Sequence, residues 1–233
     1  MAGTTRLTLL NKGQEMHQAA LFQLASGKTA DDVKAAAEAG EAELFSPTLM
    51  IPVGGPVAVA PAQQASTFVD LAEGTYVFLC NIPDAQGVPH VKLGQMATLE
   101  VEAAAEGAAA AAAPEASSSI GLGDFAFTVD ESLTAGAHVL EVTNNGAQPH
   151  EAVLMKLNEG ATAAEVAAAF APGASGPPPA MPVGGVAPIA PGAAQRFPAD
   201  LSAGRYALLC FLPDPESQKP HVELGMMAEF DVK

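Results

Sequence analysis

Several residue types are scarce in this chain of 233 residues. It has no tryptophan, two tyrosines, two cysteines and five histidines. Lysine and arginine together number 10 against 26 acidic residues, so the formal net charge is −16. Proteins that bind nucleic acid need positive charge to displace counterions from phosphates, which argues against that class. An acidic surface favours solubility and also suits a basic partner protein.

Long apolar runs are absent as well. No stretch of about 18 apolar residues predicts a membrane-spanning helix. Hydrophobic residues nevertheless make up 49% of the sequence and the mean hydropathy is +0.22, as expected for folded domains. The sequence shows no Ser/His/Asp set, phosphate-binding loop, dinucleotide-binding glycine motif or CxxC pair. The motifs of the commonest enzyme classes are therefore missing.

The scarce histidines, cysteines and tyrosines stand in a pattern that occurs twice. Each copy has an Asn-x-Gly-x-x-x-His turn, a Tyr-x-x-x-Cys strand and a Pro-His pair followed by a tail that contains methionine. The two copies run through Asn11, His17, Tyr76, Cys80, Pro89, His90 and Met96, and through Asn144, His150, Tyr206, Cys210, Pro220, His221 and Met226. One such set arises by chance more easily than two in the same order.

The repeat divides the chain into two expected domains, 1–102 and 119–233. Between them, residues 103–118 are rich in alanine and serine, which is typical of a linker. The second copy opens with an additional segment, Ile120–Asp130, which is expected to be a strand that the first copy lacks. We therefore expect the first domain to lack its opening strand, and a secretory signal to lie outside this sequence.

Short apolar-alternating segments and frequent turn residues predict an all-β sandwich in each copy. Thr29 and Thr162 each precede a carboxylate by three residues, and alanines follow, so that each sandwich should carry one short helix. Alternation also places Tyr76, Phe78 and Cys80 on one face of a strand, with the thiol near the rim of the sandwich.

One thiolate with two imidazoles is the ligand set of a blue-copper site. Two alternatives remain for the cysteines. They are inert buried thiols, or they form a disulfide, which would require their Cα atoms to lie within about 7 Å. The histidine that follows each cysteine favours metal ligation over both.

Each half resembles the cupredoxins, the blue (type 1) copper proteins such as plastocyanin and azurin. The resemblance covers residues 1–102 and 120–233 and implies two tandem Greek-key β-sandwiches with copper as the cofactor. The implied copper ligands are His17, Cys80 and His90 with an axial Gln95 or Met96 in the first half, and His150, Cys210, His221 and Met226 in the second. Nine residues separate Cys80 from His90 and ten separate Cys210 from His221. Small cupredoxins have shorter loops here, whereas the type 1 site of copper nitrite reductases has a similarly long one.

The resemblance implies an electron-transfer protein with a type 1 copper site in each domain, an unidentified redox partner and a periplasmic or extracellular location. A metal-free structural module is the alternative. A two-domain copper oxidoreductase is a third, because nitrite reductases and small laccases have a similar framework. The two blue sites would use four of the five histidines. Too few remain for a type 2 or trinuclear copper site, which argues against an enzyme.

The axial positions predict that the two sites differ in reduction potential. An oxygen ligand such as Gln95 favours the oxidised ion more than a thioether such as Met226, so the first site should have the lower potential. Redox titration of Cys80→Ala and Cys210→Ala, each of which leaves one site intact, measures the two potentials separately. Equal potentials, or a lower potential in the second site, would contradict the prediction.

Overall fold

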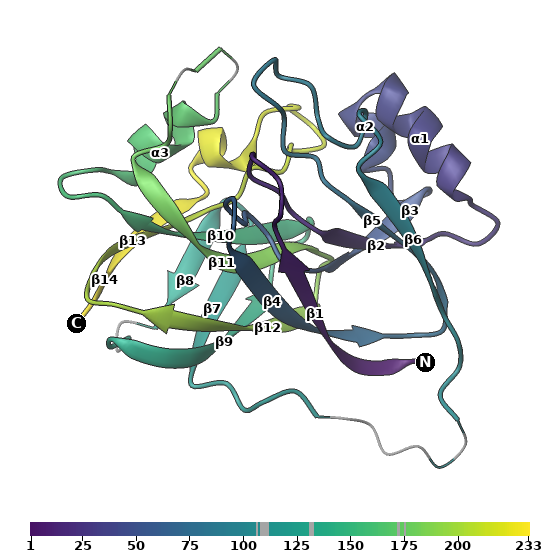
Figure 1. Cartoon of the computed structure of the whole chain (residues 1–233), viewed down its shortest axis with the longest axis horizontal. Helices are drawn as coiled ribbons and strands as arrows, with labels where there is room; N and C mark the ends of the chain where they lie inside the picture. Colours follow the sequence, from purple (N-terminus) through teal and green to yellow (C-terminus); the bar gives the residue numbers. More distant parts are fainter. Residues whose placement is uncertain (106, 108–111, 131–132, 172, 175) are drawn as a thin grey trace.

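A computed structural model describes residues 1–105, 107, 112–130, 133–171, 173–174 and 176–233. Two β-sheets form most of the molecule (Figure 1). The first has the strand order β1 (Gly3–Leu10), β4 (Gln64–Leu71), β12 (Ala194–Leu201), β9 (Gly136–Asn144), β7 (Ser118–Gly123) and β8 (Ala126–Val129). The second has the order β14 (Met227–Val232), β13 (Gly204–Leu209), β10 (His150–Leu157), β11 (Ala180–Ile189), β3 (Met50–Gly54), β2 (Ala20–Leu24), β5 (Gly74–Leu79) and β6 (Met96–Val101). The prediction of an all-β sandwich architecture is confirmed.

Short helices lie between the strands in the chain, as the sequence predicts. α1 (Ala30–Ala39) begins at a capping box formed by Thr29 and Asp32, and α3 (Ala163–Ala169) begins at the same motif formed by Thr162 and Glu165. A further turn of helix, α2 (Glu41–Leu44), follows α1 and was not expected. A 3₁₀ helix, η1, spans His221–Leu224. Among the described residues, no helix is both long and apolar enough to cross a bilayer.

The additional segment of the second half is a hairpin, where a single strand was expected. β7 and β8 pair antiparallel, and β7 also pairs parallel to β9. The turn at Asp124 and Phe125 divides the segment, and Phe125 has a φ of 62°. β1, the counterpart of β9, lies at the edge of its sheet. Residues 106 and 108–111 of the expected linker lie outside the described part of the chain.

The two halves of the repeat share both sheets. β4 of the first half pairs with β12 of the second at Phe68 and Arg196, and β3 pairs with β11 at Val53 and Ile189. The largest apolar cluster also mixes the halves, since it contains Phe22 and Leu79 from one and Met155 and Leu209 from the other. The division into domains at residues 103–118 stays a prediction, because the halves are joined through backbone and core alike.

Gln195 links the halves at this junction. Its side chain is 4% exposed. Its Nε2 donates to the carbonyl oxygen of Val53 at 2.5 Å, and its Oε1 accepts from the backbone N–H of Gly55 at 3.2 Å. Gly54 leaves room for it, because a Cβ on Gly54 would lie 2.2 Å from Gln195 Oε1. The amide therefore satisfies two backbone groups of the other half at once.

Replacing Gln195 should weaken the union of the halves. Gln195→Ala leaves a buried N–H and a partly buried carbonyl without their partner, which should lower the free energy of unfolding by about 1–3 kcal/mol. Urea denaturation of the metal-free protein measures the change. Gln64→Ala, at an exposed position of β4, is the control and should change it little. Equal effects from both variants would contradict the role of Gln195.

Candidate metal centres

A buried asparagine shapes the turn that carries the first histidine of each copy. Asn144 Nδ2 donates to the carbonyl oxygens of Gln148 and Ile189 at 2.8 and 3.0 Å, and its Oδ1 accepts from Gly146 N–H. Asn11 makes the equivalent bonds, to the carbonyl oxygens of Glu15 and Val59 and from Gly13 N–H. Each side chain thus satisfies three backbone groups that the turn would otherwise leave unpaired.

The cysteine of each copy follows directly after a strand, β5 or β13. A tyrosine on that strand anchors it, since Tyr76 Oη bonds both the N–H and the carbonyl oxygen of Ala72, and Tyr206 Oη bonds those of Ser202. Both tyrosines and both cysteines are buried, and both cysteines are free thiols. The disulfide alternative is therefore not realised.

The long loop after each cysteine folds back on itself as a small hairpin. Pro83 pairs with Pro89 in the first half, and Pro213 pairs with Pro220 in the second. The residue after each second histidine then donates its N–H to the cysteine carbonyl oxygen, Val91 to Cys80 at 2.7 Å and Val222 to Cys210 at 2.8 Å. These bonds explain how nine or ten intervening residues still bring the histidine beside the thiol.

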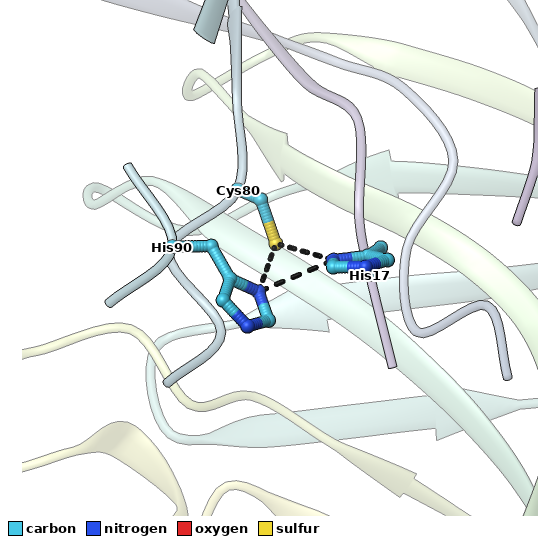
Figure 2. A group of neighbouring side chains, drawn as sticks. All are labelled: His17, Cys80 and His90. Atoms are coloured by element: carbon cyan, nitrogen blue, oxygen red, sulfur yellow. Dashed lines mark hydrogen bonds between the residues drawn. The ribbon is translucent and has the colours of Figure 1, made fainter. Parts of the chain in front are cut away.

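Site 1 consists of His17, Cys80 and His90, whose donor atoms converge (Figure 2). The two Nδ1 atoms lie 3.2 Å apart. Cys80 Sγ lies 3.4 Å from His90 Nδ1 and 3.9 Å from His17 Nδ1. His90 and Cys80 are buried, whereas His17 is partly exposed.

Site 2 consists of His150, Cys210 and His221 and repeats this geometry at full burial. The Nδ1 atoms of the two histidines lie 3.1 Å apart, and Cys210 Sγ lies 3.4 Å from His221 Nδ1. In each site the three donor atoms lie within 4.8 Å of one another. A thiolate with two imidazoles in this arrangement fits copper, the cofactor that the sequence predicts.

The candidate axial residues Gln95 and Met226 occupy equivalent backbone positions in the two halves. The carbonyl oxygen of Gln95 accepts from Cys80 N–H, and that of Met226 accepts from Cys210 N–H, both at 3.3 Å. Met226 is fully buried in the same apolar cluster as Cys210. Met96 instead packs against the large shared cluster, as does Met227. This correspondence favours Gln95 over Met96 as the axial group of site 1, and both assignments stay predictions.

Burial shifts the pKa values of ionisable groups in both sites. It lowers the pKa of His221 to about 4, with a further contribution from His150, so that the imidazole is neutral and free to bind a metal. Burial also lowers the pKa of His17 and raises the pKa of both cysteine thiols. The carboxyl group of Glu151, buried beside site 2, has its pKa raised to about 7 by desolvation. A bound cation would therefore have to displace each thiol proton.

Three polar side chains that the sequence analysis did not single out bond the outer nitrogens of the histidines. Glu15 Oε2 lies 3.0 Å from His90 Nε2, Asp124 Oδ1 lies 2.9 Å from His150 Nε2, and Gln148 Oε1 lies 3.1 Å from His221 Nε2. Glu15 and Gln148 stand two residues before the first histidine of each copy, a signal that was available in the repeat. Asp124 lies on the β7–β8 turn, which has no counterpart to align. The fifth histidine, His138, belongs to neither site and bonds Ser117 and Thr134.

Comparisons with known proteins give structural matches only. No protein-family model and no curated protein matches the chain. Among solved structures, the reduced auracyanin of Roseiflexus castenholzii is 21% identical, with 49% of this chain and 94% of that chain covered and a TM-score of 0.34. Auracyanin B is 19% identical over 52% and 93%, with a TM-score of 0.36. The copper-containing nitrite reductase of Thermus scotoductus is 12% identical over 100% and 53%, with a TM-score of 0.28.

One glycine lies against the first histidine of each site, so the two glycines can be substituted as a matched pair. A Cβ on Gly146 would lie 2.4 Å from Asp124 Oδ1 and 2.8 Å from His150 Nε2, and one on Gly13 would lie 2.9 Å from His17 Nε2. Gly146→Ala should therefore lower the copper affinity of site 2, on the order of 10-fold or more. Gly13→Ala should lower that of site 1 by less, because the more exposed His17 has room to shift.

Competition with a copper chelator measures both affinities. Gly123→Ala is the local control, since its Cβ would meet nothing nearer than the Ala126 carbonyl oxygen at 3.9 Å. An unchanged affinity of site 2 in Gly146→Ala would count against the position of His150.

Proposed function

We propose that this protein is a copper-binding electron-transfer protein with a type 1 copper site in each half. The observation that carries the proposal is the pair of His–Cys–His groups, each with its three donor atoms within 4.8 Å of one another. The proposed ligands are His17, Cys80, His90 and Gln95 in site 1, and His150, Cys210, His221 and Met226 in site 2. Copper held there supplies reversible one-electron chemistry.

The protein's part in this function is to hold the ligands still in a dry environment. The donor residues lie at strand ends and on the loops that follow the cysteines, and their backbone bonds repeat in both halves, among them Val91 to Cys80 and Val222 to Cys210. The cysteines and three of the four histidines are buried, which excludes water from the thiolates. A frame of this kind supports electron transfer, because the ligands need to move little between the two oxidation states.

His17 is the proposed point of electron exchange with the partner. It is the one histidine of the two sites that is not buried. The net charge of −16 supports a basic redox partner, since complementary charge speeds association. We also propose a periplasmic or extracellular location, for which the support is the resemblance of each half to the cupredoxins.

The histidine count supports a carrier over a copper oxidoreductase. The two sites use four of five histidines, and the remaining one, His138, is bonded to Ser117 and Thr134. A catalytic copper site of the type 2 or trinuclear class would need histidines that this chain does not supply. The metal-free module remains the second candidate, and copper loading separates it from the first.

Copper loading of single-site variants tests the proposal. The wild-type protein should retain two copper ions per chain, one for each group, and show the intense visible absorption of copper–thiolate bonding. Cys80→Ala and Cys210→Ala should each retain one ion, and the double variant should retain none and be colourless. Metal analysis after dialysis and the visible spectrum are the measurements.

His138→Ala is the matched control and should keep both ions, because its ring belongs to neither site. A wild-type protein that retains no copper would favour the metal-free module. Turnover of nitrite or dioxygen by the loaded protein would favour the oxidoreductase.

A further inference from the structure

One turn of the chain touches both histidines of site 2. Asp124, between β7 and β8, accepts from His150 Nε2 at 2.9 Å and from the backbone N–H groups of Ala147 and Gln148 at 3.0 and 3.3 Å. The ring of Phe125 meets that of His221 edge-on, with centroids 5.3 Å apart. The first half has no such hairpin among the residues described.

The bond to Asp124 determines where His150 carries its proton. An ionised carboxylate only accepts hydrogen bonds, so the imidazole must donate its Nε2–H. Both carboxyl oxygens of Asp124 also accept from the backbone N–H of Ala147, and Oδ1 accepts from that of Gln148, so the group acts as an acceptor throughout. In the Nε2–H tautomer, His150 has a free lone pair on Nδ1, the atom that lies 3.1 Å from His221 Nδ1.

A second carboxylate, that of Asp214, determines the tautomer of His221 through the side-chain amide of Gln148. Gln148 Nε2 donates to Asp214 Oδ1 at 3.0 Å, which fixes the orientation of the amide. Its Oε1 must therefore accept, and the donor is His221 Nε2 at 3.1 Å. Asp214 is itself held by the backbone N–H of Ser217 at 2.8 Å. His221 is thus also protonated on Nε2, with its Nδ1 lone pair directed inward.

Two lone pairs then face each other over 3.1 Å, with the Cys210 sulfur 3.4 Å from one of them. In this pair of tautomers neither Nδ1 carries a proton, so the contact between the two nitrogens joins two acceptors and is not a hydrogen bond. A cation bound by both nitrogens would remove the repulsion between the lone pairs. The surrounding hydrogen bonds therefore prepare site 2 for a metal before any metal binds.

Site 1 is prepared less completely. Its direct carboxylate, Glu15, bonds the second histidine, His90, and not the first. Glu15 stands at the position that Gln148 holds in the other half. Among the described residues, no carboxylate is hydrogen-bonded to the first histidine, His17, which is partly exposed and interacts with the side chain of Gln95. The outer hydrogen bonds thus differ between two sites whose His–Cys–His donors match.

We propose that Asp124, directly, and Asp214, through Gln148, are positioning residues that hold both histidines of site 2 as Nε2–H tautomers, so that site 2 binds copper more tightly than site 1. The proposal rests on the proposed copper function for its affinity part. Its tautomer part concerns the metal-free protein and stands independently.

Nitrogen-15 NMR of the histidine rings in metal-free protein tests the tautomers. In the wild type, His150 and His221 should both carry the proton on Nε2. Asp124→Ala should release His150 into a mixture of tautomers, and Asp214→Ala should release His221, because Gln148 is then free to turn. Asp124→Asn keeps an acceptor oxygen and should largely retain the His150 tautomer. Unchanged tautomers in both alanine variants would overturn the proposal.

Copper affinity is measured in the Cys80→Ala background, where site 2 is the remaining site. Asp124→Ala should weaken copper binding about 10–100-fold, as expected for loss of an outer partner of a ligating histidine, and Asp124→Asn should weaken it less. Glu15→Gln is the matched control, because it alters an outer partner of site 1, and should leave site 2 unchanged. The affinity of site 2, measured in Cys80→Ala, should also be higher than the affinity of site 1, measured in Cys210→Ala.

The outcomes separate this inference from the proposed function. The expected tautomers in a protein that retains no copper would refute the function and the affinity part while supporting the positioning roles. Copper bound at site 2 with an affinity that Asp124→Ala changes by less than about twofold would refute the positioning role of Asp124 and leave the function intact.

Discussion

Each site depends on a buried asparagine side chain at the end of a strand. Asn11 and Asn144 each bond three backbone groups around the following turn, and the first histidine emerges from that turn. In the second half the same turn also presents Gln148 to His221. An amide that both donates and accepts is required here, because a carboxylate would leave two carbonyl oxygens without a donor.

The shared sheets place two such sites in one rigid frame. Val53 pairs with Ile189 across the halves, and Gln195 satisfies backbone groups of the opposite half from a buried position. Apolar side chains of both halves form one cluster. Movement of one half against the other would break these bonds and open that cluster.

The sequence predicted those parts of the fold that depend on motifs present in both copies of the repeat. The strands that carry Cys80 and Cys210, the helices capped at Thr29 and Thr162, and the convergence of histidines and cysteines follow from motifs that occur twice. The hairpin at Asp124 was expected as one strand, since nothing in the first half aligns with it. The pairing of the halves through Gln195 was not foreseen, because it depends on which strand edges meet in space and not on any local pattern.

The two sites share their His–Cys–His donors and differ in the charges around them. Beside Cys210 lies the buried carboxyl group of Glu151, which accepts from Phe211 N–H, whereas the corresponding residue in the first half is the uncharged Gln18. Burial and this carboxyl group both raise the pKa of the Cys210 thiol. Displacing the Cys210 proton therefore adds to the cost of metal binding at site 2. In the proposed tautomers, the inward lone pairs of His150 and His221 offset this cost, because a cation held there would be bound by both imidazoles and by the thiolate.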